Sequence, residues 1–528
     1  MWASILSRRQ SSAPPPLTIH APWAWPSWKK TAIKVIGVAG LLFVLMVGLA
    51  LAGDPSGGST GTAADVIAQT AGSPTAAEMA AEIGHVKISL NMFFLIFGGA
   101  LVFFMQAGFA LVETGFCRSK NAVHVIMTNF VIFAIGTIVY WAIGYAFQFG
   151  GAGSFATLGA TEPMGALASV APDWGVIGYQ GFFLAGKSYD VAIVAMFFFQ
   201  LVFMDTAATI PTGGMAERWK FSAFVVYGAF ISAILYPIYG SWVWGGGWLA
   251  ALGRNLGIGH GAIDFAGSGV VHAVGGFAAL AGAMVLGPRI GKFGKDGKPR
   301  AILAHNMPIA IFGVIILVFG WVGFNGVSTL AATDLRFGIV IVNTFISASA
   351  AALASMFLVW KVWKKPDPSM TANGMLAGLV AITAPCAFVT PIGAFVIGVI
   401  TGVLVVGSII FVERYLKVDD PVGAVSVHGV NGVWGLIALG LFADGSYGAG
   451  WNGVEGTVRG LFYGGGAGQL AAQAIDAAVV FIWAFGLMYI FFRIQKRIQG
   501  IRVTRDEEMI GLDIPEMGVP AYPASPHL

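Results

Sequence analysis

Long apolar stretches separated by short polar connections run through most of this chain. Eleven of them have about the length, 17 to 25 residues, at which a helix crosses the hydrocarbon core of a bilayer. They lie at 88–112, 123–148, 190–214, 220–239, 265–287, 303–326, 337–362, 371–386, 391–412, 425–443 and 468–492. The pattern therefore predicts an all-α membrane protein with eleven transmembrane helices in a single domain, residues 88–492.

A further apolar run, residues 35–52, stands apart from the others near the N-terminus. Five basic residues precede it, and its small-residue end, Ala50-Leu51-Ala52, resembles a signal-peptide cleavage site. We expect residues 1–52 to be a removed signal peptide, with a retained extra helix or a mis-assigned start codon as alternatives. Residues 53–87, rich in Gly, Ser, Thr and Ala, are expected to form a flexible outer segment.

Composition supports the membrane assignment and excludes several other classes. Of the 528 residues, 57% are hydrophobic and 10% are charged, whereas an average soluble domain carries roughly 25% charge. The two cysteines, Cys117 and Cys386, are too few for a disulfide scaffold or a multi-cysteine metal site. No nucleic-acid pattern and no motif for an organic cofactor is found, so we expect neither a nucleic-acid partner nor a cofactor.

Lysine and arginine are distributed unevenly over the connections between the expected helices. Nineteen lie in the connections and tail that share one side of the membrane, and four lie in the connections on the other side. The positive-inside rule then predicts a multi-pass protein whose first span starts outside and whose C-terminus, residues 493–528, is a cytoplasmic tail.

Two segments of the chain align without gaps. Residues 264–276 and 420–432 share six of thirteen positions, and in each an Asp precedes a His by eight residues. The first copy enters from the outer side and the second from the inner side, five spans later, which predicts an inverted five-plus-five repeat around a central pore. The alternative is chance similarity between two Gly- and Val-rich helices.

The two histidines of the repeat, His272 and His428, are expected at the bilayer midplane. Eight helical residues rise about 12 Å, close to half of a roughly 30 Å hydrocarbon core. A buried histidine can simply bond to a neighbouring carbonyl, but related positions in two halves favour a functional pair. Two histidines are too few for a catalytic zinc site, so we expect no metal and a directly bonded neutral pair.

Five motifs together carry a resemblance to a known family. They are the two repeat segments, Met215-Ala-Glu-Arg-Trp219, Trp244-Gly-Gly-Gly247 and Gly320-Trp-Val-Gly-Phe-Asn325. The chain resembles the Amt/Rh ammonium transporters, specifically the bacterial Amt branch. The resemblance implies eleven helices around a pore, a homotrimer with one pore per subunit, and uptake of ammonium through the bacterial inner (plasma) membrane rather than an enzymatic activity.

The resemblance also implies roles for individual residues along the pore. His272 and His428 resemble the paired pore histidines, and Phe203 and Phe324 resemble two stacked rings that gate the pore from outside. Phe199 lies one helical turn from Phe203 on the same face. Without the resemblance, phenylalanines among 40 others would be read as core or lipid-facing side chains.

Four residues resemble an outer site for recruiting ammonium: Trp244, Phe203, Ser328 and, beneath them, the carboxylate of Asp264. Trp244 could instead belong to the aromatic belt of the membrane interface. Asp264 could act as a helix N-cap, a role compatible with a functional one. Ser328 could likewise cap or turn the chain.

These residues suggest how ammonium would be distinguished from potassium. Aromatic faces attract both cations, but ammonium can lose a proton and enter a narrow apolar pore as neutral ammonia, whereas burial of a potassium charge is prohibitive. Two alternatives remain open. One is an ammonium sensor of the same fold, and the other is a conduit for another small gas, as in Rh proteins.

Two further features have less certain roles. Asp205 lies within a span about 200° around the helix from Phe203, so we expect a structural bond to a neighbouring helix or subunit rather than a pore role. The tail contains residues 511–516, which resemble a docking segment for a PII-type regulatory protein, although 517–519 read Met-Gly-Val instead of the usual sequence. A solvated, disordered tail is the alternative.

Overall fold

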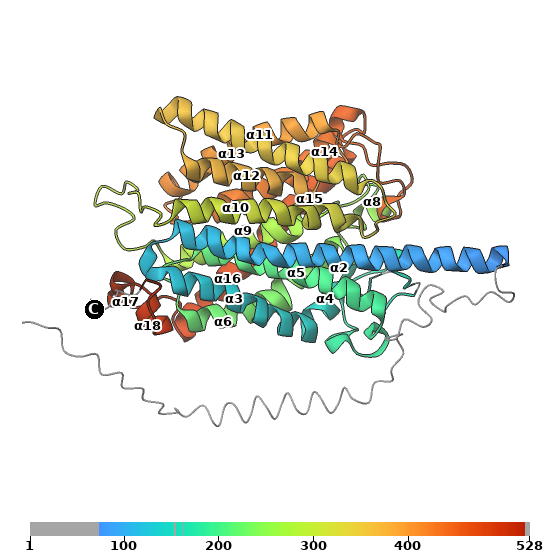
Figure 1. The fold of residues 1–528 in the computed structure, drawn as a ribbon, viewed down its shortest axis with the longest axis horizontal. Helices are drawn as coiled ribbons and strands as arrows, with labels where there is room; N and C mark the ends of the chain where they lie inside the picture. The colour runs from blue at the N-terminus through green and yellow to red at the C-terminus, as the bar shows by residue number, and fades with distance from the viewer. Residues whose placement is uncertain (1–72, 153–154, 161, 523–528) are drawn as a thin grey trace, which may run out of the picture. The chain divides into compact units, whose positions relative to one another are not determined.

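The structure is a computed structural model that describes residues 73–152, 155–160 and 162–522. The expected signal peptide and most of the expected flexible segment lie outside these residues. The described chain is mostly helical (Figure 1). Its helices are α2 (Ala76–Phe116), α3 (Ala122–Val139), α4 (Tyr145–Phe149), α5 (Val191–Gly214), α6 (Phe221–Phe230), α7 (Tyr236–Val243), α8 (Leu252–Leu256), α9 (Val274–Leu286), α10 (Met307–Trp321), α11 (Phe337–Trp363), α12 (Pro368–Thr383), α13 (Pro391–Arg414), α14 (Asn431–Phe442), α15 (Gly468–Val480), α16 (Leu487–Ile498), α17 (Arg505–Ile510) and α18 (Asp513–Met517).

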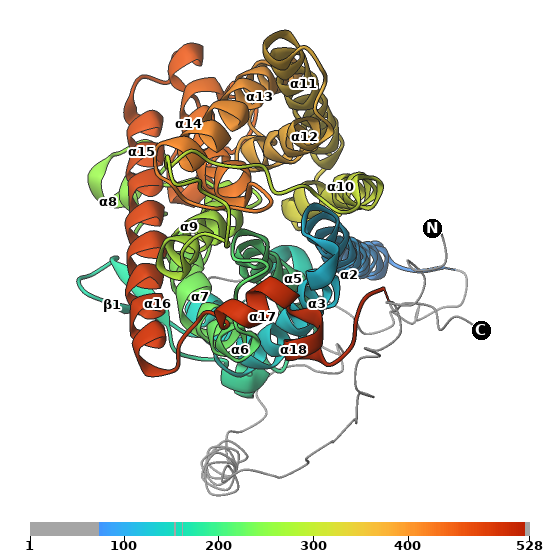
Figure 2. The same cartoon turned by 90° about the vertical axis from the view of Figure 1, so that its left-hand side faces the viewer.

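Ten helical segments in the described residues are long and apolar enough to cross a membrane. They are Ala76–Phe116, Ser119–Phe149, Val191–Gly214, Phe221–Val243, Ser268–Leu286, Met307–Thr329, Phe337–Trp363, Pro391–Arg414, Val425–Phe442 and Gly468–Ile498. Each coincides with an expected span. The remaining expected span, 371–386, forms α12, whose 16 residues rise about 24 Å and are largely buried between neighbouring helices (Figure 2).

The first helix begins earlier than the apolar pattern predicts. Thr75 accepts a hydrogen bond from the backbone of Glu78, and the Glu78 side chain accepts one from the backbone of Thr75. This reciprocal capping box starts α2 at Ala76, so the last twelve residues of the segment expected to be flexible, 76–87, are helical. Residues 76–87 include polar side chains, so no continuous apolar run marks this part of the helix in the sequence.

Six π-helical turns interrupt the spans in the described part of the chain. They lie at Tyr140–Gly144, Ile231–Leu235, Ser268–Ala273, Val322–Gly326, Val425–Val430 and Phe481–Gly486. Such turns are frequent at functional sites. Three of them contain His272, Phe324 and His428, which the sequence analysis assigned to the pore.

The connections at the two ends of the bundle differ in character. At one end, which we call the basic end, Arg289 pairs with Glu217 and Asp419, and Arg118 also pairs with Glu217. Burial alone would raise the pKa of Asp419, but Arg218 and Arg289 hold it well below its usual range. The opposite end, which we call the pocket end, carries the short strands β1 (Leu167–Ser169) and β2 (Gly175–Gly178), paired antiparallel.

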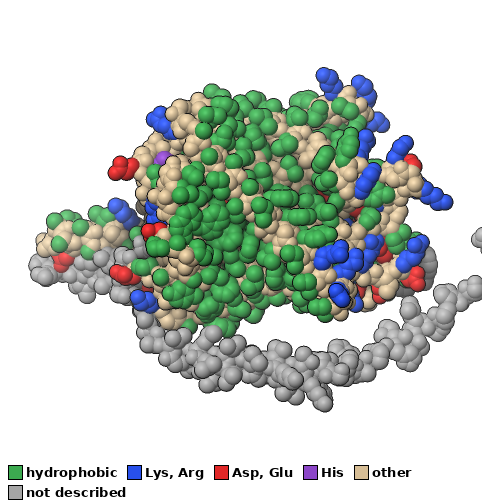
Figure 3. Space-filling view, turned by 180° about the vertical axis from the view of Figure 1, so that it is seen from behind, with side chains coloured by type: hydrophobic (Ala, Val, Ile, Leu, Met, Phe, Trp, Pro, Cys, Tyr) green, Lys and Arg blue, Asp and Glu red, His purple; other side chains and the backbone are tan. Residues whose placement is uncertain are grey.

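The outer surface of the bundle matches a bilayer. Large apolar side chains such as Phe93, Phe130 and Ile392 are exposed, and Figure 3 shows hydrophobic side chains over the middle of this face with Lys and Arg gathered toward one end. Exposed apolar surface of this extent would be unfavourable in water. The fold is therefore that of a multi-pass membrane protein.

The C-terminal tail folds back onto the basic end. α18 lies beside α3 (Figures 1 and 2). Asp513 accepts a hydrogen bond from the His124 backbone, and Glu516 accepts one from the Phe221 backbone. Glu508 binds the Ile290 backbone and the Arg502 guanidinium. The tail up to Tyr522 is thus an ordered part of the fold, and the alternative of a disordered tail does not hold for these residues.

Candidate functional site

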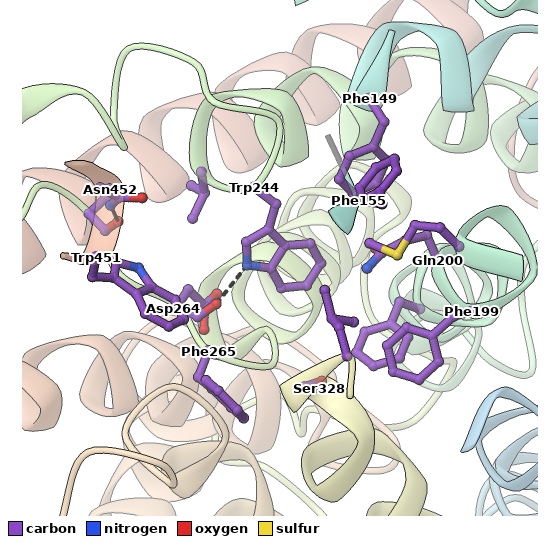
Figure 4. Close-up of a pocket in the computed structure, with 15 residues that line it drawn as sticks. Phe149, Phe155, Phe199, Gln200, Trp244, Asp264, Phe265, Ser328, Trp451 and Asn452 are labelled. Carbon is purple, nitrogen blue, oxygen red and sulfur yellow. Dashed lines mark hydrogen bonds between the residues drawn. The ribbon is translucent and has the colours of Figure 1, made fainter. Parts of the chain in front are cut away.

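A cavity of about 210 Å³ opens at the pocket end. Its lining includes Trp244, Phe203, Ser328, Asp264 and Phe199, all residues that the sequence analysis assigned to recruitment or gating. They come from four parts of the chain: helix α5, the end of α7, the connection before α9, and the turn after α10. We call this cavity the aromatic pocket (Figure 4).

Asp264 organises the floor of the aromatic pocket. Its two carboxylate oxygens accept hydrogen bonds from four consecutive backbone amides, those of residues 267 to 270, at 2.8–3.0 Å. Burial raises the pKa of Asp264 to about 6, against the opposing effect of these four bonds. Gly267 makes the tight turn possible, with φ of 114° and the Val271 side chain 2.7 Å from where a Cβ would lie. Gly267 occupies the N-cap position, and the side chain of Asp264, three residues earlier, caps the first turn of the helix.

The indole of Trp244 is fixed against the Asp264 turn. Its Nε1–H donates to the backbone carbonyl of Asp264 at 2.6 Å, as the dashed line in Figure 4 shows. Ser328 lies across the pocket, and its hydroxyl donates to the Phe324 carbonyl at 2.7 Å. Since that bond uses the hydroxyl hydrogen, the oxygen of Ser328 keeps its acceptor capacity for a ligand in the pocket.

Two phenylalanine rings close the bottom of the aromatic pocket. Phe203 and Phe324 are both buried, and their rings stack with centroids 4.1 Å apart and an interplanar angle of 25°. Phe199 packs against Phe203 at 4.7 Å, and Trp244 meets Phe203 edge to face at 6.1 Å. The rings expected to form the gate are thus in contact, with the indole above them.

His272 and His428 lie on the far side of the stacked phenylalanines. The His272 ring is 5.3 Å from Phe324, and the two histidine rings are 5.2 Å apart with their Nδ1 atoms at 3.2 Å. The Nε2 atom of His272 is buried, and no described residue forms a hydrogen bond with it. A direct bond between two neutral rings requires one Nδ1 to donate and the other to accept. The pair expected from the sequence is therefore present as a direct contact.

Close backbone contacts bring the two histidines together. A Cβ on Gly276 would lie 2.1 Å from the backbone of Gly429, and a Cβ on Gly432 would lie 2.4 Å from the Ser268 carbonyl and 3.0 Å from the backbone of Ala273. Only glycine permits this approach between the two spans. Both glycines belong to the aligned segments.

Several side chains at the site were not singled out from the sequence. Trp321 stacks on His272 at 5.2 Å; its place three residues before Phe324, on the same face of the helix, was the available signal. Gln200 and Trp451 line the aromatic pocket, and nothing local in the sequence marks them. Asp205 is buried, and its Oδ1 has no hydrogen-bond partner among the described residues, so the bond expected for it is not made within this part of the chain.

Acidic, cysteine and histidine side chains in the described residues do not gather in groups of three or more that could hold a metal ion. What converges here is a cavity with aromatic walls, a buried carboxyl group and two imidazoles in direct contact. Such a set can hold a small cation at the pocket and pass a small neutral polar molecule along the imidazoles.

Comparison with known proteins agrees with this chemistry. Residues 92–522 match the model of the Ammonium Transporter Family. Ammonium transporter Amt2 of Archaeoglobus fulgidus is 48% identical over 461 residues, covering 87% of this chain and 93% of that protein. A putative ammonium transporter of Synechocystis is 37% identical over 445 residues, covering 83% and 90%. A solved structure titled Sensor Amt Protein superimposes with a TM-score of 0.70 at 38% identity, covering 82% of this chain and 99% of that one.

Proposed function

The chain belongs to the ammonium transporter family, and we propose that it recruits ammonium in the aromatic pocket, deprotonates it and conducts ammonia through an apolar pore lined by His272 and His428. The observation that carries this proposal is the order of the groups. The pocket, the stacked Phe203 and Phe324, and the histidine pair follow one another in direct contact.

Recruitment uses the cation chemistry of the pocket. Trp244 and Phe203 offer aromatic faces to ammonium, and the Ser328 oxygen accepts one of its hydrogen bonds. Asp264 supplies negative potential and holds the backbone turn on which the indole rests. A neutral gas would gain little from such a pocket, which favours cation capture over an Rh-like gas conduit.

Selectivity follows from what lies beneath the pocket. Phe203 and Phe324 must separate for a molecule to pass, and Phe199 packs behind them. Among the described residues, the ring contacts that lead from this gate to the histidine pair involve no charged side chain, so potassium faces a large charge-burial cost there that ammonia escapes. The His272 and His428 nitrogens then offer polar contacts to ammonia within the apolar lumen.

The symmetry of the contacts supports an inverted five-plus-five repeat. Residues 264–276 and 420–432 are offset by 156 positions. Adding or subtracting this offset converts the close contact between Gly276 and Gly429 into the one between Gly432 and Ala273. It also converts His272 into His428 and the reverse. Asp420 also accepts bonds from the amides that correspond to two of those capping Asp264. If α12 is counted as the eighth of eleven spans, the repeat accounts for the first ten spans. The last span, formed by α15 and α16, lies outside the repeat.

The position in the membrane completes the proposal. We place the protein in a bacterial inner membrane, with the basic end on the cytoplasmic side and the pocket end on the outer side, in accord with the positive-inside rule. We further propose a homotrimer with one pore per subunit, and residues 1–52 as a signal peptide. The tail that packs on the basic end is proposed as a docking segment for a PII-type protein, which a pull-down with the full-length transporter under nitrogen-replete conditions would test.

The proposed transport can be measured in liposomes that contain the purified full-length protein. We expect ammonium to evoke uptake, and an equal concentration of potassium to evoke none. If neither uptake, current nor pH change accompanies ammonium addition, transport is refuted, and the alternative of an ammonium sensor is favoured. The structural similarity to a protein titled Sensor Amt Protein makes that alternative a specific one.

A further inference from the structure

A second, much smaller cavity lies between His428 and the basic end. Its volume is about 20 Å³, enough for one water-sized molecule. Its lining includes His428, Phe109, Glu113, Asn373 and Val422. We call it the inner cavity. Ammonia that leaves His428 toward the basic end would have to pass this point.

Glu113 places a carboxyl group on the wall of the inner cavity. Phe109 packs against His428 with ring centroids 6.1 Å apart. Glu113 follows Phe109 by four residues in α2, so it lies on the same face about 6 Å nearer the basic end. The carboxyl group thus comes next after the histidine pair along the proposed path.

The hydrogen bonds around Glu113 accommodate both of its protonation states. The Asn129 amide donates to Oε2 at 2.7 Å. The Thr212 hydroxyl lies 2.8–2.9 Å from the two carboxyl oxygens and 2.6 Å from the Thr209 carbonyl. Thr212 has a single hydrogen to share. When it bonds Thr209, a protonated Glu113 donates to Thr212; when it turns to Glu113, the carboxylate accepts.

No lysine or arginine forms an ion pair with Glu113 in the described part of the chain. An unpaired carboxylate in a low-dielectric interior is costly, whereas a hydrogen-bonded acid is not. The titratable groups that interact with Glu113 or share its cavity are Asp420, His428, Tyr227 and Cys117. None of them supplies a fixed positive charge.

We propose that Glu113 is a proton-exchange group for the inner half of the pore, acting on ammonia in the inner cavity. This inference rests on the proposed transport function. The acid form of Glu113 gives its proton to the nitrogen lone pair of ammonia, which leaves as ammonium while a carboxylate remains. The carboxylate then takes a proton from water on the basic side, so each cycle restores the starting state.

Glu113→Gln tests this role with little change in shape. The amide oxygen keeps the bond from Asn129, and the amide nitrogen donates to Thr212, but no proton can be exchanged. Positioned acid–base groups typically contribute on the order of 100-fold or more to rate. In proteoliposomes of uniform orientation we expect Glu113→Gln to lower ammonium uptake at least tenfold and to remove its dependence on pH at the basic side. Glu113→Asp should recover part of both.

Asp476→Asn serves as the matched control. Asp476 is a buried carboxyl in α15 that bonds to Tyr239 at 2.5 Å and lines neither cavity. We expect this variant to transport like the wild type. If Glu113→Gln keeps the wild-type rate and pH profile, the proposal is overturned. If the wild type itself transports no ammonium, the failure lies with the proposed function instead.

A measurement on the unmutated protein covers the case in which Glu113→Gln does not fold. Infrared difference spectra of full-length protein with ¹³C-labelled glutamate, recorded on adding ammonium, should show loss of a protonated carboxyl band. Asp264 and Asp420 carry no label, so they cannot produce the shift. An unchanged glutamate carboxyl region at saturating ammonium contradicts the proposal.

Discussion

Replacing Asp264 tests whether one carboxylate holds the floor of the aromatic pocket. In Asp264→Ala, four buried amides at residues 267 to 270 lose their acceptor at once. A buried donor left unpaired costs about 1–3 kcal/mol. Water from the adjacent pocket can reach some of these amides, so we take the lower bound, roughly 4 kcal/mol for the four.

Hydrogen–deuterium exchange of the full-length protein in nanodiscs measures this loss locally. Since 1.4 kcal/mol corresponds to a factor of ten, the amides of residues 267–270 should exchange about a thousandfold faster in Asp264→Ala. In Asp420→Ala two amides, those of Gly423 and Val425, lose their acceptor. The same reasoning gives a cost of about 2 kcal/mol for these two amides. Their exchange rate should therefore increase about 30-fold near residues 423–425.

Asp296→Ala is the control for loss of an aspartate, because Asp296 is exposed and its bond to the Lys298 amide is open to water. It should leave exchange in both segments unchanged. If Asp264→Ala exchanges like the wild type over residues 267–270, the carboxylate does not anchor the turn. Any loss of uptake in Asp264→Ala would then be due to the missing negative charge alone.

Four further outcomes follow from the site. Trp244→Leu should weaken the apparent affinity for ammonium about 30-fold, because a desolvated cation–π contact is worth about 2 kcal/mol; concentration-dependent uptake measures this, and an unchanged half-saturation point contradicts it. His272→Ala should lower ammonium uptake about tenfold, the value of one lost polar contact of about 1.4 kcal/mol, and wild-type uptake with intact potassium exclusion would exclude the paired-histidine role. Because burial raises the pKa of Asp264 to about 6, its negative potential is present above that pH and is lost below it. Uptake should therefore fall as the pH at the pocket end drops through 6, and Asp264→Asn should lack this step. The raised pKa also means that the folded state binds this proton more tightly than the unfolded chain, so wild-type stability should decline relative to Asp264→Asn as pH rises toward 6.

The sequence predicted most spans because each one is a continuous apolar run, and that signal is local. It missed the start of α2 because a capping box, and not hydrophobicity, sets the first turn at Thr75. The π-helical turns were also invisible, since composition does not distinguish π from α geometry. For α12 the predicted span, 371–386, has the observed length of 16 residues but starts three residues late, because the side chain of Asp367 caps the helix and sets its start at Pro368.

The candidate site was predictable where its residues carry a pattern. His272 and His428 were found because two aligned segments share an Asp eight residues before each His. Glu113 carries no such pattern. It closes an apolar run, and its neighbours Asn129 and Thr212 lie 16 and 99 residues away. The tail is similar, because Asp513 meets the His124 backbone across 389 residues. Contacts between residues so far apart in the chain produce no local pattern in a single sequence.

The histidine pair limits what the proposed pore can carry. Nδ1 of one ring lies opposite Nδ1 of the other, at 3.2 Å. Two like donors cannot face each other at this distance, so one Nδ1 carries the hydrogen and the other accepts it. The ring that donates through Nδ1 then has a bare Nε2, and the other ring has an Nε2–H.

The proposed lumen therefore presents one acceptor and one donor. Ammonia, which both accepts and donates hydrogen bonds, can use either nitrogen. A third proton would bind the bare Nε2, leave the bond between the two Nδ1 atoms in place, and bury a net positive charge beside Trp321 and Phe324. The cost of burying that charge favours the neutral pair. No charged side chain of the described residues takes part in the ring contacts of this aromatic section, so in the proposed mechanism deprotonation precedes passage of the gate.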